Sequence, residues 1–222
     1  MTLSLRSFFI FIFLCAGVLW LENSPLDFWI QDFFYDPHSK TWLISRDNAV
    51  LRIIFYTGIK NVITLFAVGL LLNILFFFYQ KRFLDDRHKG YAIVLLSIII
   101  TPLLAVLIKE LTYVHCPSRL LHYGGPSEFR SALDFSPLHD LYDRGKCFPA
   151  GHASGGFALM ALYFMSSNPR YQKIGLAVGL MIGWMMSLYQ MLKGAHFLSH
   201  SLAIMLLSWL VIVVIARLLK RY

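Results

Sequence analysis

The amino-acid sequence predicts an all-α integral membrane protein, a bundle of six transmembrane helices with both termini in the cytoplasm. Three observations support this fold class. Hydrophobic residues make up 58% of the 222 residues and charged residues 14%, whereas soluble domains have about 45–50% apolar and about 25% charged residues. Apolar runs approaching the ~20 residues that cross a bilayer occur six times along the chain. Lysine and arginine gather in alternate connections between these runs.

The six predicted spans cover, in chain order, residues 5–21, 60–79, 91–108, 152–167, 174–192 and 197–216. The first and fourth runs are short for a bilayer, so interfacial residues must extend them. In the first run Arg6 is followed by apolar residues, which is a feature of a signal peptide. No clear small-residue cleavage site follows it, which favours an uncleaved membrane anchor.

The orientation follows from the basic residues near the ends of the predicted spans. With both termini in the cytoplasm, the inner segments carry ten basic residues against only Asp85 and Asp86, and the outer segments carry the two signs in equal number. This bias satisfies the positive-inside rule. It also accounts for the net charge of +8 without nucleic acid as a partner. The inner basic residues are Arg6, Lys81, Arg82, Arg87, Lys89, Arg170, Lys173, Arg217, Lys220 and Arg221.

The chain is predicted to be one domain over residues 1–222, with two long outer segments at about 22–51 and 111–151. The aromatic residues of the first segment predict either a helix lying at the membrane interface or a tethered loop. Cys116 and Cys147 bracket the second segment, and in an oxidising compartment they form a disulfide or remain as two thiols. No compact spacing of cysteine and histidine indicates a metal site, so we expect no metal and no cofactor.

Three clusters at the outer boundary carry the candidate chemistry. Lys109, at the outer end of the third span, either reaches out to the interface or holds a phosphate. His152 follows the tight turn Pro149–Gly151 and opens the fourth span. A helix N-terminus attracts anions, and a histidine there can donate or accept a proton near neutral pH. The alternative for His152 is a solvated residue at a helix cap.

The third cluster is a pair of histidines, His196 and His200, four residues apart. On a helix such a pair shares one face, so His200 could orient His196 and leave one ring nitrogen of His196 to attack an electrophile. A metal-ligand pair and two interfacial histidines are the alternatives. Lys193 adds a positive charge just before the pair, which suits a transferring phosphoryl group.

Together these clusters resemble the phosphatidic acid phosphatase type 2 superfamily, whose signature is K-x6-R-P, then P-S-G-H, then S-R-x5-H-x3-D. The resemblance covers nearly the whole chain, because a six-helix layout with these motifs is also typical of the family. The matching positions are Lys109-x6-Cys116-Pro117, Pro149-Ala150-Gly151-His152 and Tyr189-Gln190-x5-His196-x3-His200.

The resemblance implies a metal-free mechanism. His196 would be the nucleophile that forms a phosphohistidine, and His152 would protonate the leaving oxygen. Lys109 and the N–H groups near Gly151 would hold the phosphate.

Four motif positions depart from the family pattern. Cys116 and Gln190 replace two arginines, Ala150 replaces a serine, and His200 replaces the aspartate that orients the nucleophile. Arg119 and Lys193 are the predicted substitute cations. His200 can replace the aspartate only if it is neutral and accepts the proton of His196.

The predicted function is hydrolysis of a lipid phosphate or pyrophosphate at the outer face of a bacterial inner membrane, facing the periplasm. The candidate substrates are lipid A, undecaprenyl pyrophosphate, phosphatidylglycerol phosphate and phosphatidic acid. The residues do not choose among them, and they leave the oligomeric state open. A lipid phosphotransferase and a non-catalytic lipid-phosphate-binding protein are the alternatives. A transporter is disfavoured, because no chain of polar residues continues to the other membrane face.

Overall fold

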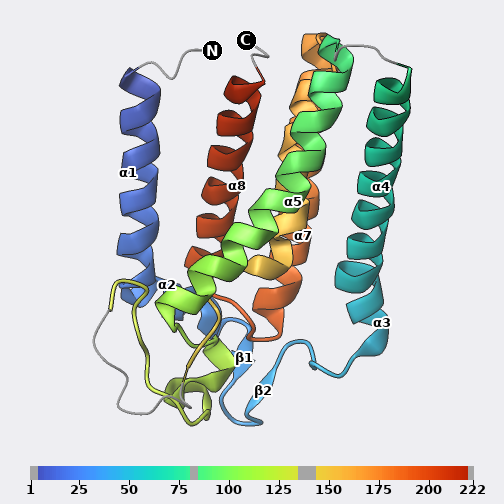
Figure 1. Cartoon of the computed structure of the whole chain (residues 1–222). Helices are drawn as coiled ribbons and strands as arrows, with labels where there is room; N and C mark the ends of the chain where they lie inside the picture. Colours follow the sequence, from blue (N-terminus) through green and yellow to red (C-terminus); the bar gives the residue numbers. More distant parts are fainter. Residues whose placement is uncertain (1–4, 81–84, 135–143, 220–222) are drawn as a thin grey trace. The chain divides into compact units, whose positions relative to one another are not determined.

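The computed structural model describes residues 5–80, 85–134 and 144–219. Its regular structure is helical apart from one short hairpin, as the sequence predicts (Figure 1). Four basic residues used in the orientation argument lie outside the described residues, and so does the side chain of Arg6. These four are Lys81, Arg82, Lys220 and Arg221.

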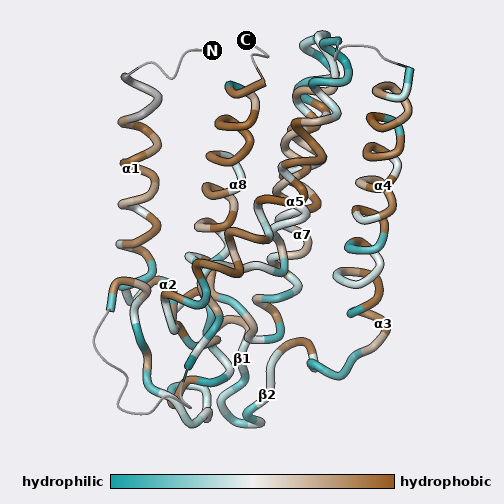
Figure 2. Tube along the Cα trace, viewed as in Figure 1, coloured by the Kyte–Doolittle hydropathy of each residue, from teal (hydrophilic) through white to brown (hydrophobic). Residues whose placement is uncertain are grey.

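Four helical segments are long and apolar enough to cross a membrane, which makes the chain an integral membrane protein. They correspond to the second, third, fifth and sixth predicted spans. Figure 2 shows hydrophobic residues along most of the length of α4 and α8. The helices in these segments are α3 (Ala49–Arg52), α4 (Gly58–Tyr79), α5 (Asp86–Thr112), α7 (Pro169–Leu192) and α8 (Leu198–Leu218), and the π-helical turn Ile53–Thr57 joins α3 to α4.

The first predicted span lies in α1 (Leu5–Glu22), which is followed by the short helix α2 (Pro25–Asp32). The two helices are bent by 66° at the break, and they count as a fifth candidate span only when joined. Ser24 is extended at the break because a residue before proline avoids the helical region. Pro25 then occupies the first turn of α2, where its missing N–H leaves no helical bond unmade.

The fourth predicted span, residues 152–167, is not one continuous α-helix. It consists of three short pieces: the 3₁₀ turn Gly151–Ala153, α6 (Ser154–Ala158) and the 3₁₀ helix Leu159–Met165. At ~1.5 Å per α-helical residue and ~2 Å per 3₁₀ residue, α6 and the 3₁₀ helix extend roughly 20 Å. A hydrocarbon core of ~30 Å is longer than that, so a sixth span is not established.

The chain divides into two compact units, each assembled from three separate segments. The first unit contains both outer segments and the connection between α7 and α8. The second contains most of the long apolar helices. The first unit comprises Met1–Asn48, Leu104–Gly151 and Ser187–Leu206, and the second comprises Ala49–Leu103, His152–Met186 and Leu207–Tyr222.

An aromatic core in the first unit joins both outer segments to the start of α8. The hairpin of β1 (Tyr35–Asp36) and β2 (Thr41–Trp42) pairs Tyr35 with Trp42. The rings of Tyr35 and Trp42 both pack against the buried Tyr123. Phe28 of α2 packs on Phe197, just before α8. These contacts hold the segment that precedes α8 against two outer segments far away in the sequence.

Buried polar groups make further connections in the first unit. Asp27, which is 1% exposed, accepts hydrogen bonds from the N–H (3.1 Å) and the hydroxyl of Ser199 in the first turn of α8. Gln31 donates its side-chain amide to the carbonyl of Met191, 2.8 Å away. A carboxylate at a helix N-terminus satisfies amide groups that have no partner within the helix. α2 therefore fixes the ends of both helices that flank His196.

In the second unit, α6 and the following 3₁₀ helix pack directly on the backbone of α7. A Cβ atom at Gly156 would lie 2.8 Å from the Cα of Gly183, and one at Gly179 would lie 2.2 Å from the amide nitrogen of Met160. Any side chain at Gly156 or Gly179 would separate the backbones. Such small residues are typical of helix contacts within membranes.

Candidate active site

His196 lies in the connection between α7 and α8. Gly194 turns the chain with φ of 68°, a conformation that favours glycine. The turn is closed by hydrogen bonds from Gly194 N–H to Met191 O (2.9 Å) and from Ala195 N–H to Gln190 O (2.8 Å). The two histidines do not lie on one helix. His196 precedes α8, whereas His200 lies in its first turn.

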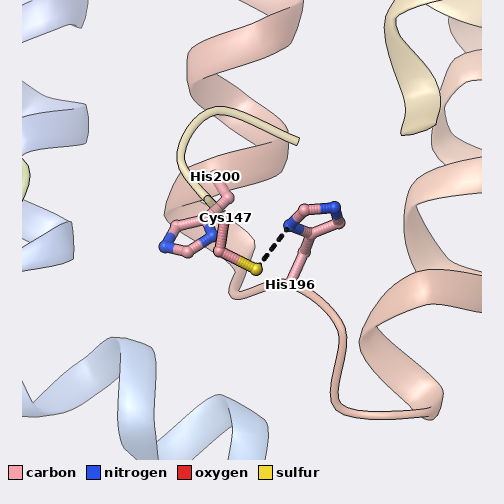
Figure 3. Close-up of side chains that lie close together, drawn as sticks. All are labelled: Cys147, His196 and His200. Carbon is pink, nitrogen blue, oxygen red and sulfur yellow. Dashed lines mark hydrogen bonds between the residues drawn. The ribbon is translucent and has the colours of Figure 1, made fainter. Parts of the chain in front are cut away.

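The two histidines and Cys147 form a buried cluster (Figure 3). The two imidazole rings are 5.8 Å apart between centroids, and they are 1% and 0% exposed. The Sγ atom of Cys147 lies between the rings in the figure, 3.5 Å from Nδ1 of His196. The nucleophile candidate therefore has a sulfur atom beside Nδ1, where family members have an aspartate to orient it.

The hydrogen bond expected between His200 and His196 is not formed. Neither ring nitrogen of His200 has a well-formed hydrogen bond within the described part of the chain, although the backbone of Cys147 is close to it. The rings of Phe148 and Phe197 both pack against the His200 ring in T-shaped arrangements. His200 thus fills the aspartate position without making the contact that an aspartate would make.

Cys147 is joined to Cys116 by a disulfide, with the two Cα atoms 5.2 Å apart, which settles the choice that the sequence left open. One ligand atom each from Cys147, His196 and His200 lies within 4.8 Å of the others, close enough to surround a metal ion. A cysteine binds a metal ion as a thiolate, and the sulfur of a disulfide is not a thiolate. The disulfide-bonded cluster therefore does not fit a metal centre.

Lys109 lies one turn from the end of α5, beside the turn that precedes His152. A Cβ atom placed on Gly151 would lie 3.1 Å from Nζ of Lys109. The Ala150 N–H donates to the carbonyl of His200 (3.0 Å), which joins this turn to α8. The structure thus brings Lys109, Gly151 and His200 together, as the motif spacing predicted.

His152 follows Gly151 directly and opens the second compact unit. It is the middle residue of the 3₁₀ turn Gly151–Ala153, rather than the first residue of a long helix. Its ring contacts the ring of Tyr56 edge-on, with centroids 5.1 Å apart.

The two predicted substitute cations differ in their surroundings. Nζ of Lys193 lies over the ring of Tyr189, 4.6 Å from its centroid. Arg119 ends the 3₁₀ turn Pro117–Arg119 and is exposed. Gln190, at the position of a family arginine, is 1% exposed, and its side-chain amide has no hydrogen-bond partner among the described residues.

Sequence reasoning missed Arg46, a cation that binds the same connection. Its guanidinium donates to the carbonyls of Lys193 and Gly194, both at 3.3 Å, and to the hydroxyl of Ser118. Arg46 is 148 residues away from Gly194 in the sequence. No periodicity or motif spacing around Arg46 marks it, so only the fold reveals this contact.

The sequence model of the PAP2 superfamily matches residues 90–222, which include Lys109, His152 and His196. The chain belongs to the PAP2 superfamily. Searches of curated proteins and of solved structures returned no match to the chain. Membership confirms the resemblance to phosphatidic acid phosphatases of type 2 and indicates a membrane phosphatase acting on phosphate esters. Arg46 and the first outer segment lie outside the part of the chain that the PAP2 family model matches.

Proposed function

We propose that the chain hydrolyses a lipid phosphate or lipid diphosphate at the outer face of a bacterial inner membrane, through a phosphohistidine on His196. The observation that carries this proposal is the convergence of Lys109, Gly151 and the His196–His200 segment within one compact unit. A lysine and backbone N–H groups suit a phosphate, and a neutral imidazole suits attack on phosphorus. Family membership supports the same reaction class.

In the first step, a ring nitrogen of His196 attacks phosphorus. The nitrogen–phosphorus bond forms as the ester phosphorus–oxygen bond breaks, and His152 donates a proton to the leaving oxygen. Nδ1 of His196 faces the sulfur of Cys147, so Nε2 is the proposed nucleophile. A proton on Nδ1 keeps the lone pair on Nε2, so the sulfur contact favours the reactive tautomer.

In the second step, water attacks the phosphohistidine and releases phosphate. His152, now deprotonated, accepts the proton of that water, which restores both histidines to their starting forms. Lys109 stabilises the negative charge that develops on the phosphoryl oxygens in both steps. Gln190 can add a neutral donor where family members have an arginine.

The proposed location of this reaction is the periplasmic side of the membrane. The proposal uses the positive-inside bias of the sequence, with six spans and both termini in the cytoplasm. Accessibility of single cysteines introduced in the connections after α4 and before α7, both of which the proposal places in the cytoplasm, tests this orientation. Labelling of these positions from the periplasm would contradict it.

Phosphate release by the purified protein in detergent tests the function. The assay uses a panel of lipid monophosphates and diphosphates, a chelator in the buffer, and His196→Ala as the matched variant. We expect release from at least one lipid by the natural chain, and none by the variant. Phosphate transfer to an added lipid or sugar alcohol would instead identify a phosphotransferase. Lipid binding without release in a folded sample would identify a binding protein and contradict the proposal.

A further inference from the structure

Arg46 is fixed on the connection that carries His196 by three hydrogen bonds. Nε donates to Lys193 O, and Nη2 donates to Gly194 O and to the hydroxyl of Ser118. The backbone next to it is held as well, because Ile44 N–H donates to Leu192 O at 3.1 Å. Arg46 therefore has a defined position against Lys193 and Gly194, which directly precede the His196 segment, although it is 148 residues away from Gly194 in the sequence.

One end of the Arg46 guanidinium remains available to a ligand. An arginine has five N–H donors in a planar fork. Three are used in the hydrogen bonds to Lys193, Gly194 and Ser118, and Nη1 makes no hydrogen bond within residues 5–80, 85–134 and 144–219. The side chain is also exposed. An anion can therefore reach the two N–H groups of Nη1 on a guanidinium that is already oriented.

Arg119 is the second cation at this place. Its backbone is fixed by the hydrogen bond from Ser127 N–H to its carbonyl (2.9 Å) and by the close approach of Gly125, where a Cβ atom would lie 2.3 Å from the Arg119 carbonyl. The pKa of Arg46 lies below its usual value because of partial burial and the nearby charge of Arg119. Arg46 also donates a hydrogen bond to the hydroxyl of Ser118, the residue before Arg119, so the backbone of Arg119 lies beside the Arg46 guanidinium.

No carboxylate neutralises this pair in the described part of the chain. The ion pairs found there involve other basic residues, and neither Arg46 nor Arg119 takes part in one. Two like charges without a counter-ion attract an anion, and guanidinium groups bind phosphate through paired hydrogen bonds.

We propose that Arg46 and Arg119 form a second anion subsite, which binds the phosphoryl group next to the one attacked by His196. This inference rests on the proposed function and names its substrate class as a lipid diphosphate. Consecutive Cα atoms are ~3.8 Å apart, so Gly194 and His196 are separated by at most about 7.6 Å. A diphosphate held between two sets of side chains can bridge that distance.

The subsite would act on the leaving group. When His196 attacks the terminal phosphorus of a diphosphate, the bridging phosphorus–oxygen bond breaks and its electrons stay on the oxygen of the lipid monophosphate. The two guanidinium groups stabilise that charge, which a monophosphate substrate would not place there. The subsite also compensates for the family arginines that Cys116 and Gln190 replace.

The test compares a lipid diphosphate with the monophosphate of the same lipid. Arg46→Gln is expected to lower kcat/KM for the diphosphate at least tenfold and for the monophosphate less than threefold. Arg46→Lys should recover only part of the loss, because an ammonium lacks the planar fork. The matched control is Arg52→Gln, which removes the same charge six residues later and takes no part in these hydrogen bonds. It should leave both substrates unchanged.

A binding measurement separates failure of this inference from failure of the proposed function. Inorganic diphosphate and inorganic phosphate are titrated calorimetrically into the natural chain and into Arg46→Gln. Tighter binding of diphosphate that is lost in the variant supports the subsite even if no lipid is hydrolysed. Equal losses on both lipid substrates would overturn it, since Arg46 would then only brace the His196 connection. Absence of diphosphate binding to the natural chain would overturn it too.

Discussion

A methyl group at Gly151 tests most sensitively the proposed phosphate-binding groups, which are Lys109 and the N–H groups near Gly151. The Cβ atom of Gly151→Ala would lie 3.1 Å from Nζ and 3.2 Å from Cε of Lys109. Non-bonded atoms prefer separations of ~3.5–4.0 Å, so the ammonium group must move by about 0.5 Å. A displacement of ~1 Å can lower a rate ~100-fold, so we expect about a tenfold lower kcat/KM, equivalent to about 1.4 kcal/mol.

The matched control is Gly155→Ala, four residues later. Its Cβ atom would meet Cδ1 of Ile63 at 3.7 Å, which is an ordinary contact. Phosphate release is measured for both variants, together with their melting temperatures. Because the end of a lysine side chain can move, both variants should fold with little loss of stability. Equal kcat/KM values for the two variants would refute the proposed role of Lys109, beside Gly151, in binding phosphate.

Three further substitutions test the first compact unit, each by thermal or denaturant unfolding in detergent. Replacing Cys116 and Cys147 by serine opens a loop with a sequence separation of 31. This should lower the free energy of unfolding by about 3.7 kcal/mol, and an unchanged midpoint of the unfolding transition would contradict it. Asp27→Ala leaves the start of α8 without its acceptor and should cost ~1–3 kcal/mol, with a smaller loss for Asp27→Asn; equal losses would argue against the cap. Gly194→Ala forces φ of 68° on alanine and should cost at least ~1–2 kcal/mol while lowering activity; full activity would contradict its role in placing His196.

The sequence predicted the membrane class and the main chemical groups because both depend on local patterns. Apolar runs identify helices directly, and α4, α5, α7 and α8 lie where the sequence predicts them. The motif spacing also predicted that Lys109, Gly151 and the histidine pair would converge. These groups lie at the ends of predicted spans, so the topology alone places them at one boundary.

Other features could not be predicted because they depend on contacts distant in the sequence. Arg46 reaches the His196 connection only through the packing of the first outer segment, in which Trp42 covers Gly194. The fourth predicted span has enough apolar residues for a helix, yet Gly155 and Gly156 weaken the helical state and 3₁₀ structure follows. Residue spacing also could not show that His200 would point among aromatic rings instead of bonding to His196.

Trapping the covalent intermediate tests the central claim most directly. The purified protein is mixed for a short time with a lipid phosphate or diphosphate labelled in the terminal phosphoryl group, quenched in base, and digested for peptide mapping. The account predicts an acid-labile, base-stable label on the peptide that contains His196, and no labelled protein for His196→Ala. Turnover without any labelled histidine, or a label that persists in His196→Ala, would contradict the account.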